Sequence, residues 1–165
     1  MRQHSAFIGF GSNLEDRLDN CRQALEALAA LPACRLLETS LFYETDPVGF
    51  EEQPPFINGV ALLKTVQDAH WLLRQMLSIE TMLGRVRVRK WGPRSIDLDL
   101  LFFDDLIIDS PDLSVPHPLL HERRFVLEPL NEIAPNFRHP SLGKTVAELL
   151  TELKDVDQQV KVLFD

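Results

Sequence analysis

Cysteine is scarce in this chain: Cys21 and Cys34 are the only two among 165 residues. Their spacing matches no metal-binding motif, and a disulfide-rich secreted scaffold would need more of them. Long apolar runs are also lacking. Residues 6–10 form a stretch too short for a signal peptide, and no run approaches membrane-spanning length. We therefore expect reduced thiols and a cytoplasmic protein with no membrane partner.

Basic residues are outnumbered by acidic ones, 17 against 25, which gives a formal net charge of -8. Nucleic-acid-binding domains are normally basic, so this balance argues against a general nucleic-acid partner. The glycine motifs that bind phosphates are incomplete. Gly9-x-Gly11 lacks the later glycine of a dinucleotide fingerprint, and Leu142-Gly-Lys-Thr is no P-loop because Arg138 replaces its first glycine.

The length and the 45% hydrophobic content predict one globular domain over residues 1–165, without repeats, linkers or low-complexity segments. Ser12 and Asn13 are predicted to cap the first helix, Asp68 or Thr65 the second, and Thr145 a later one. The irregular order of strands and helices favours an α+β sandwich over a doubly wound parallel sheet. The expected strands are 6–10, 35–44, 56–63, 96–103, 106–108 and about 160–164, and the expected helices are 15–31, 68–84, 125–133 and 145–153.

Two aspartates, Asp97 and Asp99, stand in the apolar strand expected at 96–103. Side chains alternate along a strand, so both carboxylates point the same way, while Leu98, Leu100 and Phe102 are expected on the opposite face. Like charges this close repel each other, and Mg²⁺ relieves such a conflict when it shares its shell with substrate phosphates. The alternative is a solvated polar edge, which an Asp-x-Asp pair alone does not exclude.

A basic cluster stands directly before this strand and makes the metal interpretation stronger. It places five of the 17 basic residues within ten positions: Arg85, Arg87, Arg89, Lys90 and Arg94. Guanidinium groups beside a metal site are the arrangement that phosphate chemistry requires. Glu80 lies on an otherwise apolar helical face, and a buried carboxylate needs a partner, so we expect it to orient one of these arginines. The alternative is a surface position at the edge of the helix.

Other polar residues admit two interpretations each. Asn58 interrupts an apolar strand, either as a strand-edge group or as an amide presented to a ligand, and position alone does not decide. His117, held between two prolines, is either structural or, with Arg123 and Arg124 nearby, part of a second phosphate patch. The segment 45–55 is long for a connection within a domain, which is typical of functional loops.

Residues 90–101, Lys90-Trp-Gly-Pro-Arg-Ser-Ile-Asp-Leu-Asp-Leu-Leu, resemble the signature of the 6-hydroxymethyl-7,8-dihydropterin pyrophosphokinase family of folate biosynthesis. The resemblance extends over nearly the whole chain. It implies a ferredoxin-like α+β sandwich, with a mostly antiparallel sheet, helices packed on it and long active-site loops. It also implies pyrophosphate transfer from ATP to the pterin hydroxymethyl group, with release of AMP, by a monomeric single-function enzyme. Further matching blocks are 11–13, 42–45, 56–58, 84–87, 115–117 and 123–125.

Carried over by position, the resemblance implies a role for each matching residue. Asp97 and Asp99 would hold two Mg²⁺ ions that bridge the phosphates of ATP, the co-substrate, and Arg85 and Arg94 would act with them in catalysis. Phe56 and Phe125 would sandwich the pterin, and Asp97 is a candidate for accepting the hydroxyl proton. The implied pterin-binding residues are Thr45, Asp46, Val48, Phe56, Asn58, Trp91, Asp97 and Phe125. The implied ATP-binding residues are Glu80, Arg85, Arg87, Arg94, Ile96, Leu100, Ser114, His117 and Arg123.

Of three departures from the family pattern, those at positions 56 and 118 affect affinity, and none removes a group that the chemistry requires. Phe56 replaces a frequent Tyr, Pro118 replaces an aromatic residue, and the segment 84–91 is one residue shorter than in some relatives. Val88 and Arg89 therefore have no assigned counterparts. We expect residues 48–55 and 86–92 to close over the site, with Trp91 in the lid.

Two other functional classes remain open from the residues alone. A metal-dependent nucleotidyltransferase also uses Asp-x-Asp on a strand, but it needs a Gly-Ser helix start shortly upstream, and Gly11-Ser12 lies far before Asp97. A non-catalytic pterin or nucleotide sensor is the second class. It is disfavoured because both aspartates and both arginines expected to act in catalysis are present.

Overall fold

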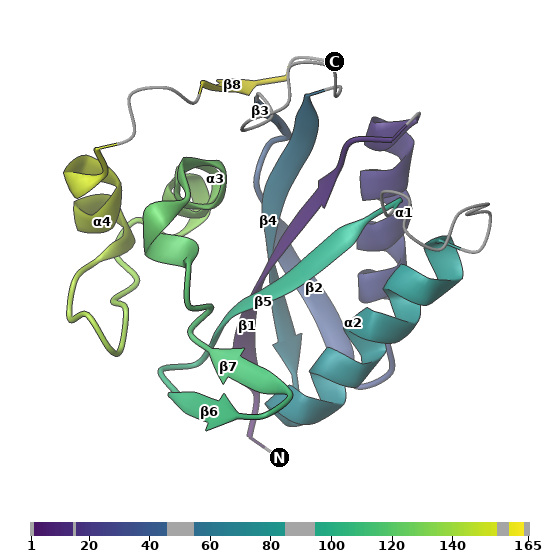
Figure 1. The fold of residues 1–165 in the computed structure, drawn as a ribbon. Coiled ribbons are helices and arrows are strands. Elements are labelled where there is room, and N and C mark those ends of the chain that lie inside the picture. The colour runs from purple at the N-terminus through teal and green to yellow at the C-terminus, as the bar shows by residue number, and fades with distance from the viewer. Residues whose placement is uncertain (1, 15, 46–54, 85–94, 155–158, 164–165) are drawn as a thin grey trace.

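The computed structural model describes residues 2–14, 16–45, 55–84, 95–154 and 159–163. Within these ranges one antiparallel sheet separates two helical layers (Figure 1). Its strands are β1 (His4–Ser12), β2 (Cys34–Thr39), β3 (Tyr43–Thr45), β4 (Phe56–Thr65), β5 (Asp97–Phe103) and β8 (Val160–Val162). Their order is β5-β1-β4-β3-β8, and β2 pairs with the other half of β4. This is the ferredoxin-like α+β arrangement that the sequence predicted.

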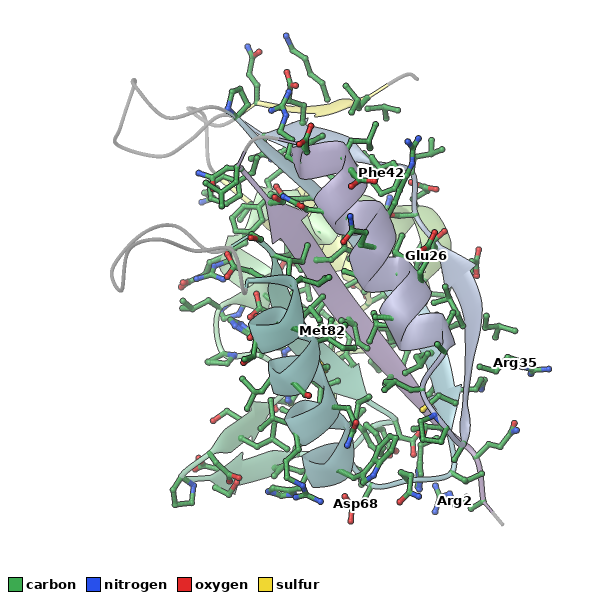
Figure 2. All side chains as sticks on the ribbon, turned by 90° about the vertical axis from the view of Figure 1, so that its right-hand side faces the viewer. Arg2, Glu26, Arg35, Phe42, Asp68 and Met82 are labelled. Atoms are coloured by element: carbon green, nitrogen blue, oxygen red, sulfur yellow. The ribbon has the colours of Figure 1, made fainter. Side chains whose placement is uncertain are left out.

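The first layer consists of α1 (Arg17–Ala29) and α2 (Ala69–Leu83), which pack against each other and against one face of the sheet. Figure 2 looks onto this layer, with Glu26 and Met82 labelled on the two helices. Cys21, Ala24 and Leu28 of α1 are fully buried, in agreement with the helical periodicity of the sequence. Asp68 caps α2 by accepting the N–H of Trp71 at 2.8 Å, as predicted.

The second layer covers the opposite face with α3 (Arg124–Ile133) and α4 (Val146–Glu152), preceded by the 3₁₀ turn η1 (Leu120–Glu122). Its apolar side chains pack on Phe7, Val60 and Leu101 of the sheet. Thr145 and Glu148 form a capping box at the start of α4, which confirms the predicted cap. The hairpin of β6 (Ile108–Ser110) and β7 (Leu113–Val115) lies beside β5.

Three local predictions were wrong, and each has a physical reason. The strand expected at 35–44 is two strands, because the Ser40 hydroxyl accepts the N–H of Val60 in place of a ladder bond. Ser12 continues β1 rather than capping α1, whose N-cap is Asp16. The short strand expected at 106–108 as the partner of the strand at 96–103 lies instead at Ile108–Ser110 and pairs with β7.

The side-chain alternation of β5 holds only as far as Leu100. The pairing with β1 shifts between Phe7 and Ile8, so Leu101 is an extra residue in β5. Phe102 therefore packs with Phe7 and α3 and not, as predicted, on the face that carries Leu98 and Leu100. The bulge thus gives both faces of the sheet large side chains from one strand.

Candidate active site

Asp97 and Asp99 lie at the start of β5, opposite two glycines of β1. Gly11 is the partner of Asp97 and Gly9 the partner of Asp99. Residues directly opposite in an antiparallel pair share a face, so both carboxylates project on the α3 side of the sheet, beside two positions without side chains. Asp97 is exposed and Asp99 is half-buried. The predicted common orientation of the aspartates is confirmed.

Glu80, in the last turn of α2, supports this strand from its outer edge. Its Oε2 accepts the backbone N–H of Leu98, the residue between the two aspartates, at 2.8 Å. Because β5 is an edge strand, a carboxylate here takes the position of a neighbouring strand. The arginines expected to partner Glu80 lie outside the described residues.

His117 connects the segment after β7 to β5 and stands close to Asp99 and Arg123. Its N–H donates to the carbonyl of Leu101 at 2.9 Å, and its Nδ1 accepts the N–H of Leu119 at 3.2 Å. The ring is therefore held with Nε2 as the protonated nitrogen. Burial lowers the pKa of His117, the Asp99 carboxylate raises it, and Arg123 lowers it. The net direction of the pKa is downward, which favours the neutral imidazole over the charged form.

Arg123 and Phe125 link this polar group to the start of α3. The guanidinium carbon of Arg123 lies 5.5 Å from the centroid of the Phe125 ring, which is a cation–π distance. Phe125 itself is half-buried. The structure thus brings His117, Arg123 and Phe125, which the sequence assigned to ATP and pterin binding, to one side of the sheet.

Asn58 of β4 and Thr45 of β3 supply buried polar atoms on the same face, beyond the glycines of β1. Asn58 is 8% exposed and Thr45 2%. The atoms Asn58 Oδ1 and Thr45 Oγ1 have no hydrogen-bond partner among the described residues. A buried polar atom left unsatisfied is costly, so it points to a ligand or water that completes its bonding. Phe56, opposite Thr45 in the register, is half-buried beside them.

Gly11 separates Asn58 from Asp97, and its lack of a side chain is required there. A Cβ added to Gly11 would lie 2.5 Å from Asn58 Nδ2. The amide of Asn58 therefore reaches over the bare backbone of β1 towards the aspartates. Sequence reasoning gave Gly9 and Gly11 no role, although their i, i+2 spacing in a strand, like that of Asp97 and Asp99, was the signal that both share a face.

Several predicted residues have a restricted role or lie outside the described structure. Ile96 and Leu100 are 1% and 4% exposed, so their side chains belong to the core and only their main chain can meet a ligand. Ser114 is exposed on β7. The roles implied for all of these site residues stay predictions. Six of the residues also lie in ranges 46–54 and 85–94, which are not described: Asp46, Val48, Arg85, Arg87, Trp91 and Arg94. The expected closure of those two loops stays a prediction for the same reason.

The family model of 7,8-dihydro-6-hydroxymethylpterin-pyrophosphokinase matches residues 7–135. This chain belongs to that family. The resemblance drawn from the sequence is thereby confirmed. The expected activity, transfer of pyrophosphate to a hydroxymethyl-dihydropterin in folate synthesis, is confirmed with it.

Named relatives agree with this family assignment. A 2-amino-4-hydroxy-6-hydroxymethyldihydropteridine pyrophosphokinase of Pseudomonas aeruginosa is 43% identical over 144 residues, which are 87% of this chain and 88% of that protein. One of Haemophilus influenzae is 38% identical over 151 residues, 92% of this chain and 94% of that protein. The chain spans only 22% of the folic acid synthesis protein fol1 of Schizosaccharomyces pombe, to which it is 37% identical.

Solved structures support the fold. The wild-type HPPK-DHPS of Plasmodium falciparum with pteroate aligns with a TM-score of 0.74 at 18% identity, over 92% of this chain and 42% of that chain. The chain therefore spans less than half of this solved relative. No helix in the described part of the chain is long and apolar enough to cross a membrane.

Proposed function

We propose that the face bounded by Asn58, Gly11 and Asp97 binds both substrates and transfers the pyrophosphoryl group of ATP to the pterin hydroxymethyl group, releasing AMP. The observation that carries this proposal is the buried Oδ1 of Asn58, which has no partner among the described residues and is separated from the two aspartates by β1 alone. An unpartnered amide oxygen and two carboxylates, separated only by glycine backbone, suit a polar heterocycle on one side and a metal–phosphate group on the other.

Asp97 and Asp99 are the proposed ligands of two Mg²⁺ ions. Among the described residues, no three His, Cys, Asp or Glu side chains gather closely enough to hold a metal ion by themselves. Two carboxylates on one face fit Mg²⁺ instead, because this ion takes one or two protein carboxylates and completes its shell with water and substrate phosphates. When bound, the ions would offset charge on the phosphate oxygens. Asp97 is the candidate acceptor of the hydroxyl proton.

The pterin is proposed to lie between Phe56 and Phe125, with Asn58 and Thr45 at its polar edge. Asn58 can accept a ring N–H through Oδ1 and donate through Nδ2, which matches a heterocycle that presents both kinds of group. Phe56 keeps the aromatic face for stacking, without the hydroxyl that many relatives have there. Asp46, Val48 and Trp91 are proposed to complete this pocket.

ATP is proposed to extend from the aspartates along the outer edge of β5 towards His117 and Arg123. Antiparallel pairing with β1 turns the N–H and C=O of Leu98 and Leu100 outward, and Glu80 takes the N–H of Leu98. Leu100 is then placed to meet the adenine through its main chain, with Ile96 and Ser114 beside it. The phosphates would face Arg123 and the Nε2 of His117, together with Arg85, Arg87 and Arg94.

Catalysis at such a site is mainly positioning and electrostatic stabilisation. Attack of the hydroxyl on the β-phosphorus gathers negative charge on the transferred group, which arginines offset. We also propose that residues 1–165 act as one monomeric unit in the cytoplasm. The free thiols of Cys21 and Cys34 support a reducing compartment.

The test is ATP turnover with 6-hydroxymethyl-7,8-dihydropterin and Mg²⁺, with AMP, ADP and pyrophosphate separated. We expect AMP in step with the pterin diphosphate, no AMP without pterin, and loss of turnover by at least about a hundredfold for Asp97→Asn, which keeps the shape of the side chain. Chelation of the metal should abolish turnover and its restoration should recover it. Free pyrophosphate as the product, or full activity of Asp97→Asn, would overturn the assignment.

A further inference from the structure

Arg17, the first residue of α1, bonds to both sides of the segment that joins β3 to β4. Its Nη2 donates to Glu44 Oε2 at 2.8 Å, and its Nη1 donates to the carbonyl oxygen of Pro55. Glu44 precedes the proposed pterin contact Thr45, and Pro55 precedes the proposed stacking residue Phe56. One guanidinium group therefore joins the two chain positions next to two proposed pterin contacts.

These bonds lie on the face of the sheet opposite to the proposed pterin pocket. Glu44 pairs with Ile57, whose side chain belongs to the cluster that packs on α1 and α2. Thr45 and Phe56 are the next pair along and point to the α3 side. Arg17 therefore has no direct access to the pterin, and any effect on it must pass through the backbone of β3 and β4.

Strand β3 is short enough for such anchors to matter. It contains three residues and pairs with β4 over only three positions. From the α3 side it is held by Tyr43, whose hydroxyl donates to Glu132 Oε1 at 2.6 Å. Arg17 provides the corresponding tie from the α1 side. The bonds of Tyr43 and Glu44 thus hold the strand next to Thr45 from opposite faces of the sheet.

We propose that Arg17 is a positioning residue for the pterin substrate. It fixes the spacing of Thr45 and Phe56 by binding Glu44 and Pro55, and so keeps the pocket preformed. The proposal rests on the proposed function, because it concerns the pterin side of that site. It predicts that loss of Arg17 weakens the use of pterin and leaves the use of ATP nearly intact, since the proposed ATP contacts in the described part of the chain lie at β5 and beyond it in the sequence.

The competing explanation is an ordinary surface ion pair. The side chains of Arg17 and Glu44 are 29% and 35% exposed, and pairs at such exposure contribute little to stability. An ordinary pair, however, has no reason to include the main-chain carbonyl of the residue directly before a second strand, β4. The bond to Pro55 makes the guanidinium a bridge between β3 and β4, and Arg is suited to this because its donors form a rigid fork.

The experiment compares Arg17→Gln with Arg35→Gln, which removes the same charge from exposed β2. For Arg17→Gln we expect the KM for 6-hydroxymethyl-7,8-dihydropterin to rise about three- to tenfold, with the KM for ATP and kcat within about twofold. Arg35→Gln should match the wild type. The double variant Arg17→Glu/Glu44→Arg restores the ion pair with the charges swapped. Glu at position 17 cannot donate to the Pro55 carbonyl, so we expect the KM for pterin to recover only in part.

An unchanged pterin KM in Arg17→Gln would overturn the proposal. Parallel changes in both KM values would also overturn it, because they would indicate general destabilisation. Amide hydrogen exchange adds a readout that does not depend on activity: exchange in Tyr43–Thr45 should quicken in Arg17→Gln and stay unchanged in Arg35→Gln. Unchanged exchange would count against the bridge itself. A wild-type protein that forms no AMP would instead contradict the proposed function, and the exchange result would still decide the role of Arg17 in the fold.

Discussion

Glu80 and Leu98 meet across the outer edge of β5, where a carboxylate oxygen accepts a backbone N–H at 2.8 Å between two catalytic candidates. The bond joins α2 to β5, so it sets the distance between α2 and the Asp97–Asp99 segment. A hydrogen bond to a charged group contributes about 1.5–3 kcal/mol, enough to hold a frayed strand end in place. Glu80 thus connects the core layer to the proposed metal site.

Replacement of Glu80 should therefore act on the metal requirement. We expect Glu80→Ala to raise the Mg²⁺ concentration at half-maximal activity several-fold, because the aspartates lose their fixed spacing. Glu80→Gln keeps an oxygen acceptor and should lie between the wild type and Glu80→Ala. A magnesium titration of turnover measures this, with the exposed Glu26→Ala as the control. Equal magnesium curves for all variants would contradict the role.

The two glycines of β1 provide a matched pair of substitutions. A Cβ at Gly11 would lie 2.5 Å from Asn58 Nδ2, whereas a Cβ at Gly9 would meet the side chain of Leu101 at 3.5 Å, an ordinary contact. We expect Gly11→Ala to displace the Asn58 amide and lower pterin affinity at least about tenfold, while Gly9→Ala changes it little. Equilibrium titration with the pterin checks this, and equal affinities would show that Asn58 does not contact the ligand.

The two phenylalanines proposed to stack on the pterin should behave differently towards ATP. Phe125 also carries the guanidinium of Arg123 at 5.5 Å, whereas Phe56 lies on β4 beside Thr45. Phe125→Leu should therefore raise the KM for both substrates, and Phe56→Leu should raise the KM for pterin alone. Steady-state kinetics with each substrate varied separates the two. A normal KM for ATP in Phe125→Leu would contradict the proposal that Phe125 affects ATP binding through Arg123.

His139 should make stability depend on pH. Burial lowers the pKa of this ring, and His121 beside it lowers it further. Its Nδ1 accepts the N–H groups of Ser141 and Leu142, both at 3.1 Å, so protonation there would break two bonds. A lowered folded-state pKa means that this stability is complete above about pH 6.5, the unfolded value, and is lost as pH falls through the folded value.

Asn offers an acceptor oxygen that does not titrate, so His139→Asn should flatten the fall in unfolding free energy below pH 6.5. The slope that one such group contributes is at most about 1.4 kcal/mol per pH unit. Urea denaturation at a series of pH values provides the measurement. His121→Asn should remove part of the pKa shift and leave a smaller change. An identical pH profile in His139→Asn would assign the acid sensitivity to other groups.

What the sequence predicted well depended on local periodicity. The common face of Asp97 and Asp99 follows from the two-residue repeat of a strand, and the buried stripe of α1 follows from the helical repeat. The roles of Asn58 and His117 stayed open, because the same residues in a strand or loop can be structural. Only their convergence on one face, with Asn58 Oδ1 unpartnered, favours a binding role.

What the sequence could not predict depended on pairing between distant segments. Phe102 was assigned to the wrong face because one extra residue in β5 relative to β1 is invisible in either strand alone. The backbone N–H of Leu98 as a partner of Glu80 was missed because sequence reasoning matched charge with charge. The role of Arg17 was missed because Glu44 and Pro55 lie far from it in the chain and meet it only when β3 and β4 pair.

The bulge in β5 also ties the two halves of the molecule into one cooperative unit. Leu100 and Phe103 are buried with α1 and α2, while Leu101 and Phe102 are buried with α3 and α4. Neither helical layer can detach without exposing large side chains of the strand that carries Asp97 and Asp99. We therefore expect the two helical layers to unfold together. A partly unfolded form that keeps one layer intact would already have lost the native packing of β5, the strand that carries Asp97 and Asp99.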